Sequence, residues 1–213
     1  MKRVFSILTI SGIMFAVSCI AFLQVSQAVT VSKTFTVSAN IPSATGLTIT
    51  ASRVASSTNA FTVVSGTALS FDPMTLTNGI YLPGHFFAID VGTTGGAGSP
   101  AVTVTYTEGA NPNNPRNGLG TKATATFIKV QGVTGNQTET GLVSHGPKKM
   151  LKNINSETIT SAELTGGFLR IYVGIVTKDQ GATFPDPAGS ETFSNTDTPG
   201  NYDGTIFISA TVA

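Results

Sequence analysis

A stretch of strict alternation near the start of the chain constrains its fold more than any other feature. Residues 29–41 read VTVSKTFTVSANI, in which every second residue is apolar except Lys33. A period of two is the pattern of a β-strand with one buried face, and such a strand needs a sheet to bury it. Residues 42–46, PSATG, follow as a short joint. This stretch predicts a strand that joins a sheet, either in its own chain or in a neighbouring one.

The rest of the chain repeats this alternation in short segments. Apolar residues alternate with Thr or Ser in several stretches, namely residues 46–54, 101–107, 123–130 and 202–212. Residues 168–176, FLRIYVGIV, are the most apolar run after the first 28 residues and predict a central strand. The segment 142–164 fits either short strands or one helical turn. With about seven to nine short strands and no amphipathic helix, the sequence predicts an all-β fold, a β-sandwich with Greek-key connections.

The first 28 residues have the pattern of a secretory signal peptide. Lys2 and Arg3 precede an apolar run, and Ser26-Gln27-Ala28 fits a cleavage site. A membrane anchor is the alternative, but no basic cluster follows the run. We therefore expect a secreted protein with three parts: a signal peptide at 1–28, an N-terminal strand at 29–41 and a sandwich domain at 42–213.

Composition argues against several functional classes. Lys and Arg number 12 and Asp and Glu 11, and two of the basic residues belong to the predicted signal peptide. A nearly neutral mature chain offers no charge pattern for a nucleic-acid partner. The only cysteine, Cys19, also lies in the signal peptide, so we expect no disulfide. Charged residues make up only 11% of the chain, whereas the 23 glycines suit turns between strands.

No motif predicts catalysis, a cofactor or a metal site. His85 and His145 are the only histidines, and neither has a second ligand at a spacing typical of zinc sites. Neither a nucleophile elbow nor a phosphate-binding loop is present, so we expect a protein that is not an enzyme and has no small-molecule substrate. Three lysines, Lys148, Lys149 and Lys152, predict a solvated loop. Three aromatic residues could line a sugar-binding surface, but alternation favours the core for Tyr81, Phe86 and Tyr106.

The end of the chain resembles a known family. Residues 198–206, TPGNYDGTI, with the alternating strand that follows to Ala213, are similar to the C-terminal strand of chaperone–usher pilus subunits. The likeness is greatest to the archaic and alpha groups, which include spore-coat-U-like subunits. LSFDP at 69–73 and FFAIDV at 86–91 are similar to an early strand pair of these subunits. A signal peptide followed at once by an alternating strand is also shared.

The resemblance implies a structural subunit of an extracellular pilus. Such subunits have an immunoglobulin-like sandwich that lacks one strand and is completed by the N-terminal strand of a neighbour. It implies partners as well: copies of the same chain joined head to tail, a periplasmic chaperone and an outer-membrane usher. The donated strand would present Val29, Val31, Phe35, Val37, Ala39 and Ile41. The C-terminal strand would present Tyr202, Ile206, Ile208, Ala210 and Val212.

A second interpretation stays open at this point. Residues 29–41 can fold back into their own sheet as the first strand of an ordinary sandwich. The protein would then be a secreted monomeric adhesin or carbohydrate-binding protein.

Overall fold

Strands are the main secondary structure of the described residues. The computed structural model describes residues 34–40, 46–94, 98–109, 118–135, 139–178 and 183–212, and within 34–40 it describes the backbone alone. In this part of the chain helix is limited to α2 (Leu119–Lys122) and the 3₁₀ turn η1 (Leu151–Asn153). The fold is therefore all-β, as the sequence predicts. The predicted signal peptide and the predicted donor-strand residues Val29, Val31 and Ile41 lie outside the described residues.

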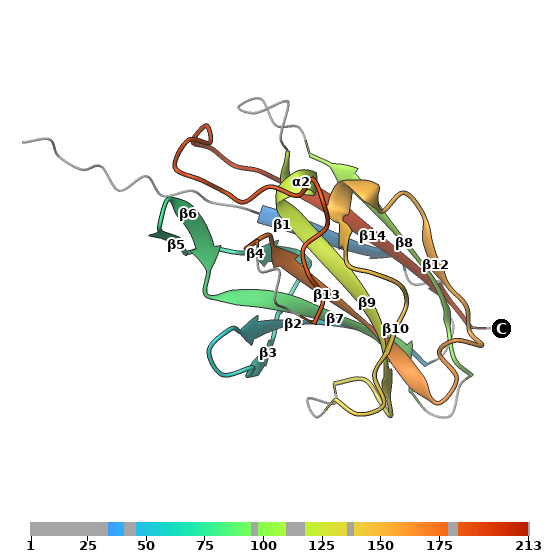
Figure 1. Ribbon diagram of the computed structural model, residues 1–213. Helices are drawn as coiled ribbons and strands as arrows, with labels where there is room; N and C mark the ends of the chain where they lie inside the picture. The colour runs from blue at the N-terminus through green and yellow to red at the C-terminus, as the bar shows by residue number, and fades with distance from the viewer. Residues whose placement is uncertain are drawn as a thin grey trace, which may run out of the picture.

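Two large sheets form two layers (Figure 1). The first sheet has five strands in the order β12 (Glu157–Ile159), β8 (Ala101–Glu108), β14 (Gly204–Thr211), β1 (Thr34–Asn40) and β4 (Ala68–Ser70). The second sheet has seven, ordered β10 (Val143–Ser144), β9 (Ala123–Gln131), β13 (Gly167–Ile175), β7 (His85–Thr93), β2 (Leu47–Ala55) and β3 (Phe61–Val63), with β11 (Lys149–Met150) also paired to β9. A separate hairpin joins β5 (Met74–Thr77) to β6 (Ile80–Pro83).

One apolar core lies between the two sheets. The first sheet contributes alternate residues of β8 and β14, where Val104 pairs with Ile208 and Val102 with Ala210. The second sheet contributes Phe127 and Ile171, which stand opposite each other on β9 and β13. Because strand side chains alternate between faces, this register turns the apolar residues of both sheets toward each other.

The centre of the second sheet is covered on its outer face as well. Strand β13 lies between β9 and β7, and of its nine residues only Gly167, Tyr172 and Gly174 are more than slightly exposed. A small outer cluster, made of Ile128, Val130 and Phe168, packs with the half-buried rings of Tyr172 and Phe184. A strand that is buried on both faces has a nearly continuous run of apolar residues in its sequence. The prediction of a central strand at 168–176 is therefore confirmed.

A buried ion pair completes this outer layer. Arg170 on β13 is 0% exposed, and its Nε and Nη2 donate to the two carboxylate oxygens of Asp90 on β7, each at 2.7 Å. Its Nη1 donates to Glu139 at 3.1 Å. The guanidinium also lies 4.8 Å from the ring centroid of Phe61 and 5.3 Å from that of Phe168. Bidentate hydrogen bonding and ring contacts compensate the loss of water around the charge.

The structure differs from the expected pattern mainly in the number of strands. The described residues contain fourteen strands rather than seven to nine, because short pieces such as β5, β10, β11 and β12 carry too few residues to show a period. The short helix α2, in which Leu119 and Gly120 are buried, was not indicated by the alternating pattern either. In 142–164 the structure contains both of the alternatives, short strands and the 3₁₀ turn η1.

Candidate functional site

The N-terminal strand β1 fills a slot between the last strand of the chain and β4. It runs parallel to β14, with Phe35 opposite Gly204 and Asn40 opposite Ser209. It runs antiparallel to β4 over three residues, with Phe35 opposite Leu69. Among the described strands, β1 and β14 form the only parallel pair; the other pairs are antiparallel.

The predicted donor-strand residues that are described occupy positions along this slot. Phe35, Val37 and Ala39 stand in register with Gly204, Ile206 and Ile208 of β14. Within one chain, β1 therefore completes its own first sheet. Whether the same strand also pairs with a neighbouring chain stays a prediction.

The wall of the slot is the predicted C-terminal strand. Ile206, Ile208 and Ala210 are at most 2% exposed and belong to the core, whereas Phe207 between them is 39% exposed. Val212 lies just past the end of β14 and is half-buried. Without β1, the first sheet would keep β14 paired only to β8, and β4 would have no neighbour in that sheet. The first sheet is therefore continuous from β14 to β4 only when a strand occupies this slot.

Tyr202 anchors the start of the C-terminal strand. Its side chain is 0% exposed, and its hydroxyl donates to the backbone oxygen of Thr198 at 2.8 Å. Its ring meets that of Phe193 edge-on, with centroids 5.1 Å apart. A buried tyrosine usually finds such a hydrogen bond, and here it holds the turn before β14 in place.

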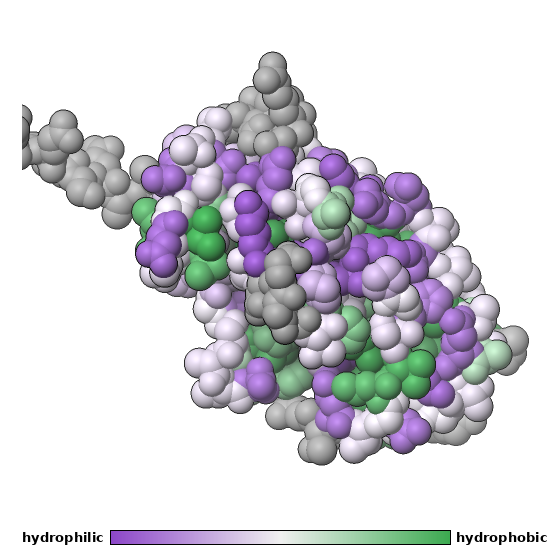
Figure 2. Space-filling view, viewed as in Figure 1, coloured by the Kyte–Doolittle hydropathy of each residue, from purple (hydrophilic) through white to green (hydrophobic). Residues whose placement is uncertain are grey.

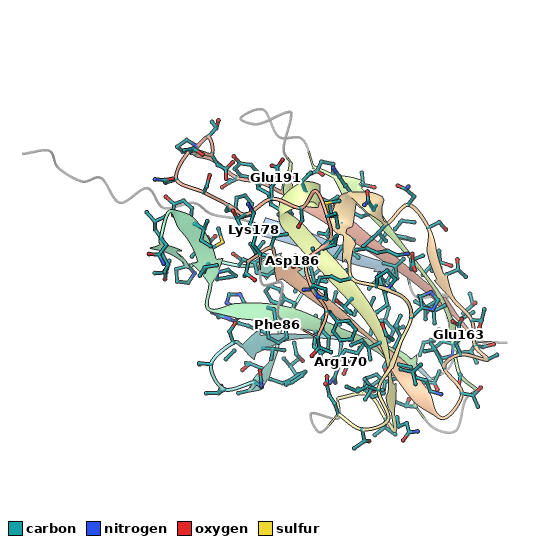
Figure 3. All side chains as sticks on the ribbon, viewed as in Figure 1. Phe86, Glu163, Arg170, Lys178, Asp186 and Glu191 are labelled. Carbon is teal, nitrogen blue, oxygen red and sulfur yellow. The ribbon has the colours of Figure 1, made fainter. Side chains whose placement is uncertain are left out.

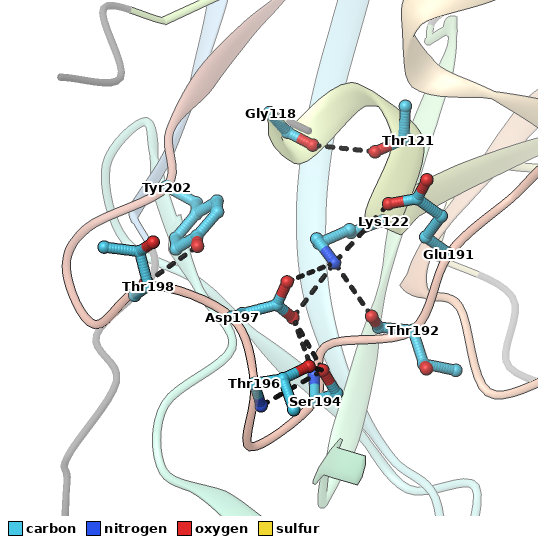
Figure 4. Close-up of polar contacts among 10 residues, drawn as sticks. All are labelled: Gly118, Thr121, Lys122, Glu191, Thr192, Ser194, Thr196, Asp197, Thr198 and Tyr202. Atoms are coloured by element: carbon cyan, nitrogen blue, oxygen red, sulfur yellow. Dashed lines mark hydrogen bonds and ion pairs between the residues drawn. The ribbon is translucent and has the colours of Figure 1, made fainter. Parts of the chain in front are cut away.

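A second anchor comes from the buried lysine at the end of α2 (Figure 4). Lys122 is 2% exposed, and its Nζ donates to the backbone oxygen of Thr192 at 2.9 Å. The same nitrogen lies 2.9 Å from a carboxylate oxygen of Asp197 and 3.7 Å from one of Glu191. Asp197 in turn accepts the backbone N–H of Ser194 at 2.7 Å. This cluster fixes the chain just before β14 against the start of β9.

Sequence reasoning did not identify Lys122. Its partner Asp197 lies 75 residues away in the chain, and nothing local to either residue links them. The only sequence signal for its burial is that Lys122 directly precedes an alternating strand and has no acidic residue near it in the chain.

The other residues considered from the sequence, the histidines and the lysines, do not come together in one site. Among the described residues no group of three or more metal-ligating side chains comes together. Of the three lysines expected in a solvated loop, Lys152 is exposed, whereas Lys148 and Lys149 form ion pairs with Asp186 and Glu157. His145 does have carboxylates nearby, which the sequence spacing did not reveal: Glu163 at 2.8 Å and Glu157 at 3.3 Å. Hydrogen bonds from the backbone and hydroxyl of Thr160 lower the pKa of Glu163.

Comparison with family models, with curated proteins and with solved structures finds no match to this chain. The described part of the chain holds no helix with the length and apolarity that crossing a membrane requires. The slot around β1 therefore has to be interpreted from its own geometry.

Proposed function

We propose that this chain is a structural subunit of an extracellular filament, which polymerises by inserting its N-terminal strand into the slot of a neighbouring subunit. The observation that carries the proposal is the position of β1, the first described strand, which lies between β14, to which it is parallel, and β4, to which it is antiparallel. The subunit would then be an immunoglobulin-like Greek-key sandwich that is incomplete without this strand. Export to the cell surface with the help of a chaperone and an usher belongs to the same proposal.

Strand direction favours exchange between subunits. A parallel ladder is slightly less stable per residue than an antiparallel one. A strand that enters from a neighbour in the reverse direction would pair antiparallel with β14, where six residues of β1 are paired, and parallel with β4, where only three are. The stability gained in the longer ladder with β14 would therefore exceed the stability lost in the shorter ladder with β4.

An empty slot also explains why a partner strand is needed. The open edge of β14 would expose unpaired backbone groups beside the apolar residues Ile206 and Ile208, which is an aggregation hazard. Strand addition from another chain satisfies these groups. Donation from head to tail is a heterologous contact, and such contacts build open polymers rather than closed dimers.

The experiment is negative-stain electron microscopy of the mature chain, residues 29–213, beside a variant that lacks residues 29–41. We expect filaments from the first and none from the second. A matched pair of substitutions in β1 refines the test: Val37→Asp, in register with the buried Ile206, should prevent filaments, whereas Thr36→Asp, in register with the half-exposed Thr205, should permit them. Monodisperse particles from the unaltered mature chain would overturn the proposal.

A second candidate function is favoured by the pairing of β1 within its own chain. The protein would then be a secreted sandwich that acts as a monomer, for example as an adhesin. This candidate predicts folded monomers at micromolar concentration whose size does not depend on protein concentration in analytical ultracentrifugation.

A further inference from the structure

A cavity of about 590 Å³ lies on the outer face of the second sheet, away from the slot around β1. Its floor is formed by Thr124 and Thr126 of β9 and Tyr172 of β13, and its walls by Phe86 of β7 and Phe184. Figure 2 shows this face of the molecule, where apolar areas lie among polar ones. The volume falls within the range of pockets that hold small organic ligands.

Aromatic rings give the cavity flat apolar walls. Phe86 and Tyr172 meet edge to face with centroids 5.6 Å apart, which fixes both rings. Both remain partly exposed although neighbouring residues of their strands are buried. Phe184 comes from the segment between β13 and β14 and packs on the outer cluster. A rigid, partly exposed ring presents a surface on which the C–H face of a ligand can lie.

Two hydroxyl groups on the floor lack protein partners. Thr124 and Thr126 are each 4% exposed and both line the cavity. Within the described part of the chain, neither hydroxyl makes a hydrogen bond to another protein group. Neither oxygen is among the fully buried unpaired side-chain atoms of the described residues, so both hydroxyls are open to the cavity. These hydroxyls are therefore placed to bond with a molecule in the cavity.

The charges at the rim cancel each other. Lys148 Nζ donates to a carboxylate oxygen of Asp186 at 3.1 Å, and Asp186 also accepts the backbone N–H groups of Thr177 at 3.1 Å and Lys178 at 2.8 Å. Figure 3 labels Phe86 and Asp186, which reach this region from β7 and from the segment before β14. With both charges satisfied, the cavity favours a neutral ligand over an anion or a cation.

We propose that this cavity is a binding site for a neutral saccharide. Sugars combine apolar C–H faces with a rim of hydroxyl groups, and the cavity offers aromatic walls, free threonine hydroxyls and no net charge. The site is independent of the proposed function, since it lies on the second sheet and is present whether β1 pairs within its chain or between chains.

The test uses the double variant Thr124→Val and Thr126→Val, which keeps side-chain shape and β-propensity but removes both hydroxyls. A matched control, Thr103→Val together with Thr105→Val, removes two hydroxyls from β8 in the first sheet. A third variant, Phe184→Ala, removes one wall. Each mature chain is titrated with lactose, maltotriose, mannobiose and diacetylchitobiose up to 10 mM, and threonine methyl signals are followed by NMR.

We expect at least one of these sugars to bind the unaltered chain and to shift the methyl signals of Thr124 and Thr126. Binding should weaken about tenfold or more in the floor variant and in Phe184→Ala, and stay unchanged in the β8 control. The absence of binding by all four sugars would overturn the proposal, as would equal binding by the floor variant. Neither result depends on filament formation, so the two proposals can fail separately.

Discussion

Arg170 is the largest side chain among the described residues that water does not reach. Its charge is tolerated only because Asp90 meets it with two hydrogen bonds of 2.7 Å. Glu139, the other acidic partner, makes one longer bond and has a side chain 28% exposed, whereas that of Asp90 is 7% exposed. The two acids therefore offer a matched comparison between a buried and a half-buried partner.

We predict that Asp90→Ala lowers the free energy of unfolding by about 3–5 kcal/mol, because it leaves a buried charge without its main partner. The control Glu139→Ala should cost about 1 kcal/mol or less, as expected of a more exposed ion pair. Urea unfolding followed by circular dichroism measures both losses. Equal losses in the two variants would show that Asp90 has no special role.

His85 is a second residue whose burial has a measurable consequence. Its ring is 2% exposed, its Nε2 lies 2.8 Å from the backbone oxygen of Ser70, and it stacks on Phe71. Burial lowers the pKa of His85 below its ordinary value of 6.5. Between pH 6.5 and the lowered pKa, the unfolded chain binds a proton that the folded chain does not. Stability contributed by His85 is thus complete above pH 6.5 and is lost as the pH falls.

We predict that His85→Phe flattens the dependence of stability on pH between 6.5 and 5, although it loses the hydrogen bond to Ser70 and so lowers stability at pH 7. The two chains differ at this residue alone, so the difference between their slopes isolates His85. Thermal unfolding at half-unit pH steps gives the two slopes. Parallel slopes would contradict the prediction.

At the scale of single residues, the sequence predicted positions that follow from a local period and missed those that depend on distant partners. Ile206, Ile208 and Ala210 are buried as their alternation indicated. Arg170 and Lys122 were not foreseen, because the acids that allow their burial lie 80 and 75 residues away. The cavity of the second sheet was missed for the same reason, since β9, β13 and β7 meet only in the folded chain.

At the scale of elements, β1 holds the least usual position. Its pairing with β14 is the only parallel pairing among the described strands, and its other neighbour, β4, has three residues. Long strands with a clear period were predicted well, as β8, β13 and β14 show. The short strands β5, β10, β11 and β12 were not, because so short a segment carries no measurable period.

The proposed strand exchange predicts the effect of adding a second copy of residues 29–41 after Ala213 through a short Gly/Ser linker. A strand that turns back after β14 runs antiparallel to it and can fill the slot within the same chain. We expect such chains to form monomers instead of filaments in electron microscopy. A control copy with Val31, Phe35 and Val37 changed to Ser should leave filaments intact. Filaments that persist with the apolar copy would contradict strand exchange.

At the scale of the whole molecule, stability should be uneven. The centre of the second sheet is covered on both faces, with β13 held by β9 and β7. The side of the first sheet that holds β1 and the edge strand β4 is joined to the rest only by the parallel ladder between β1 and β14, and β4 has just three residues. Segments with few supporting contacts open with less free energy than the core does.

We therefore predict that the backbone amides of β1 exchange hydrogen by local opening, whereas those of β13 exchange only on global unfolding. Hydrogen-exchange mass spectrometry of monomeric chain across low urea concentrations separates the two modes, because only global unfolding responds strongly to urea. Equal exchange in β1 and β13 would show that the first sheet opens together with the second.

The parallel pairing of β1 with β14 also has a mechanical consequence. Because Phe35 lies beside Gly204 and Asn40 beside Ser209, a pull on residue 34 and on residue 211 acts in opposite directions along two adjacent strands. Such a load is a shear that strains the whole ladder at once, whereas a pull on residues 40 and 211 would peel it one bond at a time. In atomic-force stretching, the first geometry should resist a clearly higher force than the second. A single domain of this kind can carry tension between residues 34 and 211, since resistance to force follows the rate of unfolding rather than the free energy of unfolding.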